Sequence, residues 1–369
     1  MNRRRPQVGI VVPAYGVEEW LPDCLDSLIG QRHRAWTAVV VDDGSPDRSG
    51  QIAEEYASRD DRIRVVHTVN QGLGAARNEG VRHLDGDYLA FLDSDDMLPA
   101  TAYSHMVRRL ESSGSDFVSA SFQLWDDGRL QEPQWMRRLH RKKRSGMRAE
   151  EHPEILGDVF AWDKLFRRSF WDEAGLAWPE GIRYEDQPCT TAAYLRGRFD
   201  LMSDRVYQWR IRSDGTSITQ RRDSAADLAD RLESKRQSLA LVRSEGTPAI
   251  QEVFVDRVLA GDLWRYFVEL PKADDEWWRL LRDGIGELWG ERSLVHSGLM
   301  PVHRLVGWLV QHDRREEATA VAEFLVQGGT VPRTDDGTAL DPSALPGLVA
   351  GTIDPAALRL RPHERRQRP

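Results

Sequence analysis

The sequence contains very little cysteine and no excess of positive charge. Its 369 residues include two cysteines, Cys24 and Cys189, which form neither a disulfide framework nor a metal-binding pair of closely spaced thiols. Lys and Arg number 51 against 59 Asp and Glu, and the formal net charge of -8 argues against nucleic acid as a partner. The scarcity of cysteine agrees with the reducing cytoplasm, where disulfides are rare.

Long hydrophobic runs are also missing. The apolar stretch that starts at Val8 ends at Pro13, which makes it too short for the hydrophobic region of a signal peptide. No segment approaches the ~20 apolar residues that cross a bilayer. We therefore expect a cytoplasmic protein and leave open a peripheral contact with the inner face of the membrane.

Short apolar runs alternate with helical periodicity in the first part of the chain. Four of the runs have the pattern of buried strands: 8–12, 38–41, 63–66 and 88–92. Helical spacing separates them, for example over 73–84. The alternation of strand and helix predicts an α/β fold with a doubly wound, mostly parallel sheet.

The pattern changes near residue 224. Strand signals stop there, and amphipathic helical stretches follow at 228–242, 253–270, 277–289 and 302–326. The end of the chain is rich in Pro, Gly, Asp and Arg. We expect an α/β domain over 1–224, a helical C-terminal region over 225–328 and a loosely ordered tail over 329–369.

Acidic residues follow two of the predicted strands at their carboxyl ends, where doubly wound sheets bind ligands. Asp42 and Asp43 follow the second strand, and the run Asp93-Ser94-Asp95-Asp96 follows the fourth. This run fits a hard divalent cation that also binds phosphate oxygens, but an acidic turn before a helix has the same pattern. Asp43 fits a hydrogen bond to a nucleobase or ribose, with an Asx turn as the alternative.

A glycine-rich segment, NQGLGAARNEG, begins at Asn70. Gly72 and Gly74 follow a strand and open a helix, as in a dinucleotide-binding fingerprint, which would predict an NAD-binding oxidoreductase. Arg77 stands where that fingerprint requires its third glycine, and the segment follows the third strand instead of the first. An arginine at this position suits a diphosphate, although a surface salt bridge explains it equally well.

Two later segments carry groups that could act on a substrate. In the run Tyr184-Glu185-Asp186-Gln187-Pro188 a carboxylate could serve as a general base, and an acidic helix start is the structural alternative. Residues 210–219 combine Arg, Gly, Ser and Thr, which suits a mobile loop over phosphates, with a plain polar loop as the alternative. No single motif decides the function.

Six motifs follow one another between residues 8 and about 219. They are VVPAYGVEEWLPDCLDSL, VVVDDGSPDRS, NQGLGAARNEG, GDYLAFLDSDD, WDKLF and YEDQP. Their order and approximate spacing resemble those of the family 2 glycosyltransferases of the GT-A fold. The resemblance implies a GT-A catalytic domain, and WDKLF is similar to members that act on cell-wall or capsule polymers.

The resemblance also implies a nucleotide site. Pro13 and Tyr15 would line the base pocket, with Tyr15 stacked on the pyrimidine, and Asp43 would hydrogen-bond the base. Asn70 and Arg77 would lie on either side of the ribose and the diphosphate. We expect the nucleotide to be UDP.

The same resemblance implies a metal site and a catalytic base. Asp93 and Asp95 match the Asp-x-Asp motif that holds Mn²⁺ or Mg²⁺, with Asp95 as the direct ligand. Asp186 matches the base of inverting members, and Glu185 would contact the acceptor or the donor sugar. The implied nucleotide-sugar site is completed by Ser94 and by the lid residues Ser217 and Thr219.

The resulting hypothesis is a metal-dependent, inverting hexosyl- or N-acetylhexosaminyltransferase that uses a UDP-sugar in polysaccharide biosynthesis. Its acceptor would be a hydroxyl on a polysaccharide, a wall polymer, a lipid-linked glycan or another glycan. The helical C-terminal region would shape the acceptor site or form the contact of a homo-oligomer. The alternatives are an NAD-binding oxidoreductase and a non-catalytic nucleotide-binding or scaffold module.

One strongly basic run stands apart from these motifs. Residues 137–148, RRLHRKKRSGMR, contain five Arg and two Lys and no acidic residue. A solvated loop is the simplest interpretation. A patch for an anionic acceptor or for lipid headgroups is the alternative.

Overall fold

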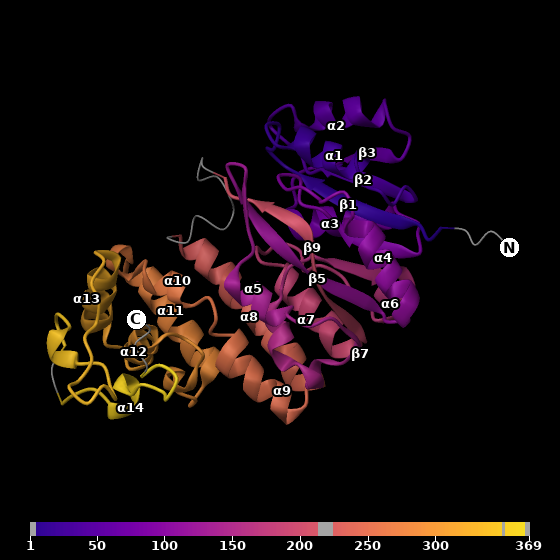
Figure 1. Ribbon diagram of the computed structural model, residues 1–369. Coiled ribbons are helices and arrows are strands. Elements are labelled where there is room, and N and C mark those ends of the chain that lie inside the picture. The colour runs from indigo at the N-terminus through magenta and orange to yellow at the C-terminus, as the bar shows by residue number, and fades with distance from the viewer. Residues whose placement is uncertain (1–4, 213–223, 349–350, 366–369) are drawn as a thin grey trace. The chain divides into compact units, whose positions relative to one another are not determined.

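The structure is a computed structural model that describes residues 5–212, 224–348 and 351–365 (Figure 1). The chain divides into two compact units. The first comprises residues 1–217 with 244–246, and the second comprises 218–243 with 247–369.

A nine-stranded sheet in the order β3-β2-β1-β4-β8-β5-β9-β7, with β6 paired to β5, forms the centre of the first unit. The strands are β1 Val8–Ala14, β2 Trp36–Asp42, β3 Ile63–His67, β4 Tyr88–Phe91, β5 Phe117–Asp126, β6 Arg129–Gln131, β7 Arg144–Met147, β8 Lys164–Arg167 and β9 Phe199–Arg210. The expected α/β fold and the four N-terminal strands are confirmed. The strands from β3 to β4 in this order are parallel, whereas β8 runs antiparallel to both β4 and β5.

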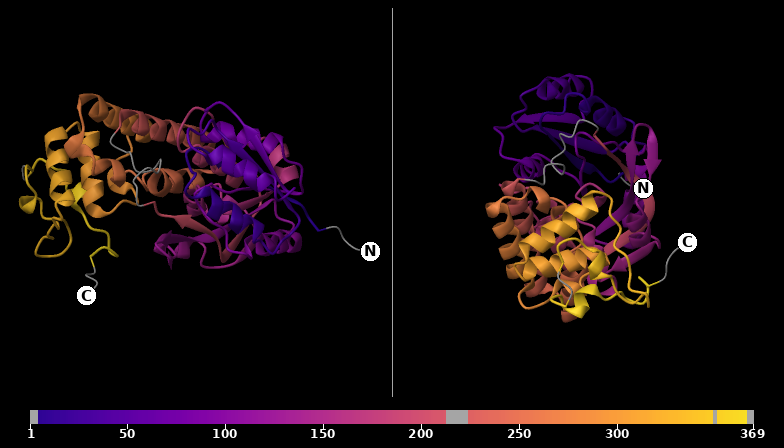
Figure 2. Two further views of the ribbon diagram at one scale, coloured as in Figure 1. Left: turned by 90° about the horizontal axis from the view of Figure 1, so that it is seen from above. Right: turned by 90° about the vertical axis from the view of Figure 1, so that its left-hand side faces the viewer.

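Helices lie on both faces of this sheet (Figures 1 and 2). They are α1 Leu21–Ile29, α2 Ser49–Ala57, α3 Leu73–Arg82, α4 Ala102–Ser113, α5 Gln134–Leu139, α6 Arg168–Glu173 and α7 Asp186–Arg196. Alternate residues of β1 divide between the faces because strand side chains point to opposite sides. Val8, Ile10 and Val12 join the core that contains α1 and α4, whereas Val11 packs directly against Gly80 of α3.

The second unit is mainly helical in its described parts. Its helices are α8 Ala225–Glu245, whose last two residues belong to the first unit, α9 Pro248–Val253, α10 Trp264–Phe267, α11 Asp275–Trp289, α12 Pro301–Gln311, α13 Arg315–Val326 and α14 Pro355–Leu358. The helical character of this region was expected, but two expected helices are interrupted. A π-helical turn at Phe254–Val258 breaks the first, and Asp313, with a φ of 55°, separates α12 from α13.

The apolar faces of these helices form a core. Leu259, Leu263, Tyr266 and Phe267 are at most 1% exposed. The Tyr266 hydroxyl donates to Asp227 at 3.0 Å, which fixes the ring against α8. No described helix is long and apolar enough to cross a membrane.

The segment from residue 329 differs from the expected loose tail in the parts that the structure describes. Leu340, Leu345 and Leu360 are buried. Arg304 of α12 is also buried, and its two terminal nitrogens donate to Glu364 at 2.6 and 2.8 Å. This segment is held by widely spaced buried leucines and by one buried ion pair. Neither feature produces a periodic pattern in the sequence, so the order of the segment could not be predicted.

Candidate functional site

The carboxyl ends of β1, β2 and β4 meet at one edge of the sheet because these strands are parallel. Asp43 follows β2, and its backbone N–H donates to the carbonyl of Ala14 at the end of β1. The Asp43 carboxylate accepts hydrogen bonds from Thr68 Oγ1 at 3.0 Å, Gln71 N at 3.0 Å and Gly72 N at 2.8 Å. Asp43 thereby fixes the loop that precedes α3, and its expected contact with a nucleobase stays a prediction.

The same loop presents Asn70 to solvent. Gly44, with a φ of 71°, lets the chain after Asp43 pass close to it, since a Cβ at Gly44 would lie 3.0 Å from Asn70 N. Pro13 is buried in β1, whereas the Tyr15 side chain just beyond that strand is 52% exposed. Exposed Tyr15 and Asn70 are therefore accessible to a ligand.

Arg77 on α3 is buried between two carboxylates. Its Nη2 donates to Asp93 Oδ1 at 2.7 Å, and its Nη1 donates to Glu185 Oε1. The guanidinium also lies 5.2 Å from the centre of the Trp178 ring. Burial alone would lower the pKa of Arg77, but Asp93 and Glu185 raise it above its ordinary value. In this structure both terminal nitrogens of Arg77 hold protein carboxylates, and the expected contact of Arg77 with a diphosphate stays a prediction.

Glu185 is equally buried and was expected to contact a sugar. Burial raises its pKa to about 7, and Asp186 adds to this effect, whereas Arg77 opposes it. Its described bond to Arg77 makes Glu185 a link between α7 and α3. The residue before it, Tyr184, has a φ of 65°, a conformation that is costly for a side chain larger than glycine. This turn places Asp186 at the first position of α7.

The segment after β4 is held by β9. Tyr207 OH accepts a hydrogen bond from Asp93 N at 3.1 Å and donates to Asp96 Oδ2 at 2.8 Å. Arg210 N donates to Asp96 Oδ1 at 2.7 Å. Burial, followed by the charges of Asp95 and Asp93, raises the pKa of Asp96 well above its ordinary value. Asp96 therefore anchors the acidic segment to the sheet.

Asp95 has a cationic partner in Arg212, just beyond β9. Arg212 Nη2 lies 2.7 Å from Asp95 Oδ2, and the guanidinium stacks 4.0 Å from the centre of the Trp20 ring. Burial raises the pKa of Asp95, Arg212 opposes this and Asp93 adds to it. Ser94, which lies between Asp93 and Asp95 in the sequence, is buried. The expected lid residues Ser217 and Thr219 lie outside the residues that the structure describes.

The acidic pair offers ligands for a divalent cation. The described hydrogen bonds engage Oδ1 of Asp93 and Oδ2 of Asp95. Each carboxylate therefore keeps a second oxygen, the ligand type that Mg²⁺ and Mn²⁺ prefer. Asp93 and Asp95 fit the expected metal, with Arg212 as the group that neutralises Asp95 in this structure.

Another buried group, His140, Asp158 and Asp163, also brings three candidate ligand atoms together. Lys164 Nζ donates to Asp158 at 3.1 Å and to Asp163 at 2.8 Å, and His140 Nε2 lies 3.0 Å from Asp158. The Lys164 ammonium already neutralises the two carboxylates. We interpret this group as a structural network that explains the acid and the lysine of the WDKLF motif.

Gly74 shows why the glycine-rich segment is not a dinucleotide fingerprint. A Cβ at Gly74 would lie 2.0 Å from the carbonyl oxygen of Pro179 and 3.4 Å from Glu185 Cγ. The glycine allows α3 to approach the loop that leads to Glu185. Its function is close packing between two parts of the site.

The Gly74→Ala substitution is expected to destabilise the first unit by about 1–3 kcal/mol, because the Pro179 backbone must move. Urea unfolding measures this loss. Gly286→Ala is the matched control, since Gly286 also lies in a helix but a Cβ there would meet no atom within 4 Å. Equal stability of Gly74→Ala and the wild type would contradict the packing argument.

Sequence reasoning missed the partners that the site takes from β9. Tyr207, Arg210 and Arg212 all contact the Asp93–Asp96 segment, although more than 100 residues separate them from it along the chain. The available signal was a strand pattern at 206–209 followed by two arginines. Only the pairing of β9 within the sheet shows that this strand ends beside the acidic segment.

Comparison with known proteins agrees with this geometry. Residues 9–173 match the family model described as "Glycosyl transferase family 2". An uncharacterized glycosyltransferase of Bacillus subtilis, EpsJ, is 34% identical over 210 residues, which are 56% of this chain and 61% of that protein. The chain therefore spans about three fifths of the length of this relative.

Solved structures show the same fold. The crystal structure of S. aureus TarS 1–349 in complex with UDP-GlcNAc has a TM-score of 0.71 and 21% identity, covering 92% of this chain and 98% of that one. The mannosyltransferase PcManGT from Pyrobaculum calidifontis, in complex with GDP-Man and Mn²⁺, has a TM-score of 0.51 and 17% identity, covering 88% and 86%. At these identities the likeness establishes the GT-A fold and no substrate.

Proposed function

We propose that this chain, whose residues 9–173 match the family model described as "Glycosyl transferase family 2", transfers a sugar from a UDP-sugar to an acceptor hydroxyl with inversion at the anomeric carbon. The observation that supports this most is that the segment with Asp93 and Asp95, at the carboxyl edge of the sheet, lies next to the turn after which Asp186 begins α7. Arg77 connects the two acidic segments through its bonds to Asp93 and Glu185. We expect the acceptor to be a cell-wall or other polysaccharide, or a lipid-linked glycan.

The donor would lie across the carboxyl ends of β1, β2 and β4. Tyr15 is free to stack on the uracil, and Asn70 is exposed beside the position of the ribose. Asp93 and Asp95 would hold Mn²⁺ or Mg²⁺, which would supply positive charge to the departing diphosphate. Arg77 acts indirectly, because it positions Asp93 and Glu185.

In the transfer step Asp186 accepts the proton of the acceptor hydroxyl. The acceptor oxygen forms a bond to the anomeric carbon from the face opposite the diphosphate. The bond from that carbon to the diphosphate oxygen breaks, and UDP leaves with the electron pair. Inversion follows from this single displacement.

A thermal-shift screen with UDP, CDP, GDP and NAD, each with and without Mn²⁺, tests the proposed function. UDP with Mn²⁺ should raise the Tm most. Stabilisation by NAD alone would indicate an oxidoreductase. Binding of UDP without any turnover of UDP-sugars would indicate a non-catalytic nucleotide-binding module.

The Asp95→Asn variant should lose the metal-dependent part of the UDP-induced shift in Tm, because an amide is a weaker ligand for a hard cation. The shift is measured with Mn²⁺ and with EDTA. Asp85→Asn removes an exposed carboxylate and serves as the control, with a shift like that of the wild type. A full Mn²⁺-dependent shift in Asp95→Asn would exclude Asp95 from the metal site.

This proposal also includes a cytoplasmic location, contact with a membrane surface and a homo-oligomer formed through the helical unit. We likewise propose the division of the chain into a catalytic domain over 1–224, a helical region over 225–328 and a tail over 329–369. All candidate catalytic residues precede residue 224. We expect the second unit to contribute to acceptor binding or to association of subunits.

A further inference from the structure

The basic run at 137–148 begins in the last residues of α5, contains β7 near its end and stops just before the 3₁₀ turn at Ala149–Glu151. Two of its seven cations are neutralised by acidic side chains. Arg137 Nε lies 3.2 Å from Glu132, and Lys143 Nζ lies 2.6 Å from Asp204. Among the described residues no ion pair is found for Arg138, Arg141, Lys142 or Arg144. In the described part of this chain, whose net charge is -8, these four cations, like Arg148, thus have no acidic side chain in an ion pair with them.

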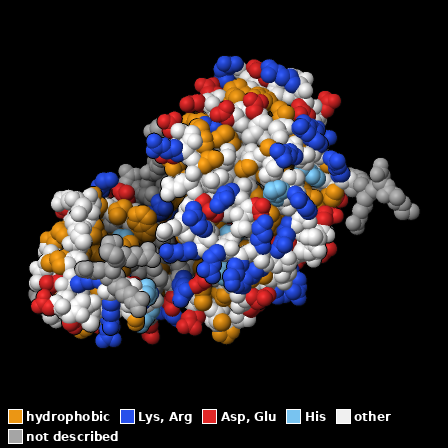
Figure 3. Space-filling view, viewed as in Figure 1, with side chains coloured by type: hydrophobic (Ala, Val, Ile, Leu, Met, Phe, Trp, Pro, Cys, Tyr) orange, Lys and Arg blue, Asp and Glu red, His pale blue; other side chains and the backbone are white. Residues whose placement is uncertain are grey.

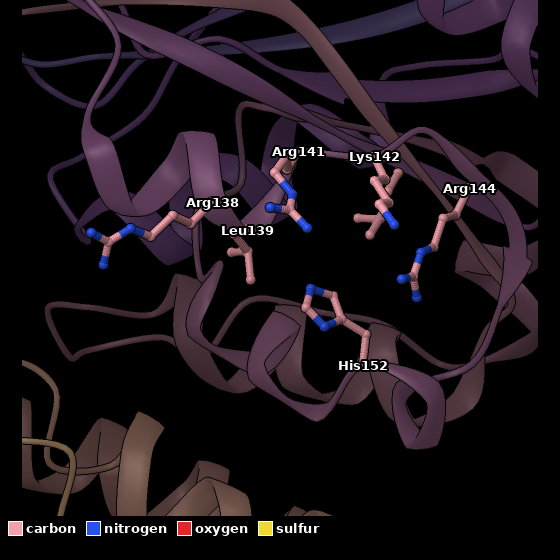
Figure 4. Close-up of a pocket in the computed structure, with 7 residues that line it drawn as sticks. Arg138, Leu139, Arg141, Lys142, Arg144 and His152 are labelled. Atoms are coloured by element: carbon pink, nitrogen blue, oxygen red, sulfur yellow. The ribbon is translucent and has the colours of Figure 1, made fainter. Parts of the chain in front are cut away.

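These four cations line a hollow in the first unit. Its volume is about 210 Å³, and its lining is completed by Leu139, His152 and Leu201. Figure 4 shows the charged ends of Arg141, Lys142 and Arg144 and the ring of His152 around one space, whereas Arg138 extends away from it. Figure 3 shows Lys and Arg side chains gathered over the region of α5. Since a water molecule takes about 30 Å³, the hollow has room for a hydrated phosphate group.

The basic segment is anchored to the protein and is not a free loop. Met136, His140 and Met147 are at most 2% exposed. His140 lies between two fixed partners, with Nδ1 3.1 Å from the Met202 carbonyl and Nε2 3.0 Å from Asp158. The backbone that carries the cations is therefore fixed beside the hollow, while the side chains of Arg141, Lys142 and Arg144 are exposed. Holding like charges together costs free energy that a bound anion would recover.

An adjoining hollow of about 260 Å³ shares Arg138, Leu139 and His152 with the first and adds Trp135, Glu154 and Gly157 to the lining. The Trp135 side chain is 46% exposed, so one face of its ring is open to a ligand. Indole rings bind the apolar faces of sugar rings well, because they combine a large apolar surface with a polar edge. The two hollows thus place an aromatic platform beside a cationic pocket.

A chain of aromatic contacts connects this platform with the acidic site. The Trp135 ring lies 6.0 Å from Phe160, and Phe160 stacks on Trp162 at 4.6 Å. Trp162 in turn stacks at 4.1 Å on Tyr207, whose hydroxyl bonds Asp93 N and Asp96. Three ring contacts within one unit therefore separate the basic pocket from the residues proposed to bind the donor.

We propose that the pocket formed by Arg141, Lys142, Arg144 and His152 binds a phosphate group of the acceptor, while Trp135 receives a neighbouring sugar or polyol. This inference rests on the proposed function and specifies the class of acceptor as a sugar-phosphate or polyol-phosphate polymer. Arginine favours phosphate because its planar fork donates two parallel hydrogen bonds to two oxygens. A concave pocket favours a single bound group over a flat, anionic membrane surface.

Binding of two defined oligomers tests this inference. A six-unit poly(glycerol phosphate) is the charged probe, and polyglycerol of the same length is the neutral one. The variant Arg141→Gln/Lys142→Gln/Arg144→Gln is compared with Arg32→Gln/Arg64→Gln/Arg108→Gln, which removes three exposed cations elsewhere and has the same net charge. UDP-induced stabilisation shows that each variant is folded.

The pocket variant should bind the charged oligomer at least about tenfold more weakly than the wild type, since each hydrogen bond to a charged group is worth more than that factor. The control variant should stay within about twofold. Trp135→Ala should weaken binding of a glycosylated phosphate oligomer and leave the binding of inorganic phosphate unchanged. Equal affinity of the two triple variants for the charged oligomer would overturn the inference.

A membrane role is distinguished by vesicles of phosphatidylglycerol and of phosphatidylcholine. Weaker binding of the pocket variant to phosphatidylglycerol vesicles, with oligomer binding unchanged, would assign the cations to a membrane surface and overturn the inference. Failure of the wild type to bind UDP or turn over any UDP-sugar would instead refute the proposed function. A failure of the inference about the basic pocket can therefore be distinguished from a failure of the proposed function.

Discussion

Replacement of Asp186 by asparagine is expected to lower turnover by about 10²–10⁴-fold, the range that follows loss of a general base. The amide cannot accept the acceptor proton, although it keeps the size and the position of the side chain at the start of α7. UDP binding should stay near that of the wild type, because the base acts on the acceptor. The effect should therefore fall on kcat and leave the Kd for UDP unchanged.

Turnover of a UDP-sugar and binding of UDP are measured on the same preparations. Asp85→Asn is again the control for loss of one exposed carboxylate. If Asp186→Asn retains more than about a tenth of the wild-type turnover, the base lies elsewhere. A parallel loss of UDP affinity would place Asp186 in the donor site.

Replacement of Arg77 by methionine is expected to lower the free energy of unfolding of the first unit by about 3–5 kcal/mol, because removing one partner leaves buried carboxylates without a counter-charge. The Arg77 side chain is 3% exposed and that of Glu185 is 4% exposed. Arg77→Lys should lose less, since it keeps the charge but not the fork that joins Asp93 to Glu185.

This loss should depend on pH. The folded-state pKa of Glu185 is raised to about 7, and removal of Arg77 should raise it further. A carboxyl with a raised folded-state pKa contributes stability at low pH and loses it as the pH rises through that pKa. The deficit of Arg77→Met should therefore be larger at pH 8 than at pH 6, as measured by urea unfolding.

The double variant Arg77→Met/Glu185→Gln provides the control. Removing the charge of Glu185 should recover part of the stability lost in Arg77→Met. A deficit that is independent of pH and unchanged in the double variant would show that packing of Arg77 against Trp178 dominates.

Much of the fold could be predicted because local patterns specify it. Val8, Ile10 and Val12 form part of a short apolar run that can be buried only as a strand between layers. Asp43 and Asp93 each follow a buried strand, so the sequence alone predicts them at one edge of the sheet. Parallel strands bring their carboxyl ends together, so this juxtaposition follows from topology alone.

The partners within the site could not be predicted in the same way. Arg77 has the sequence signature of an anion-binding arginine, and nothing nearby indicates that Glu185, 108 residues later, meets it. Arg212 reaches Asp95 because β9 pairs with β5 and continues toward the acidic segment, next to the last strand β7 in the sheet order. Such contacts depend on strand order in the second half of the sheet, which mixes one parallel pair with several antiparallel ones.

The interruptions of helices in the second unit could not be predicted from the sequence for a related reason. The apolar pattern continues from Val302 to Val326, but the chain turns at Asp313. Buried faces on both sides of the turn keep the same periodicity, so the break leaves no gap in the pattern. The cues were local polar residues at 311–315, which also occur on the exposed face of an uninterrupted helix.

The anomeric configuration of the first product tests the central claim most directly. The protein is incubated with Mn²⁺ and UDP-α-glucose, UDP-α-galactose or their N-acetylhexosamine counterparts, with water as the acceptor, and ¹H NMR is recorded before mutarotation. An inverting transfer at Asp186 predicts release of UDP from at least one donor together with the β-anomer of its sugar. Initial release of the α-anomer, or no UDP from any of these donors while UDP still binds, would contradict the account.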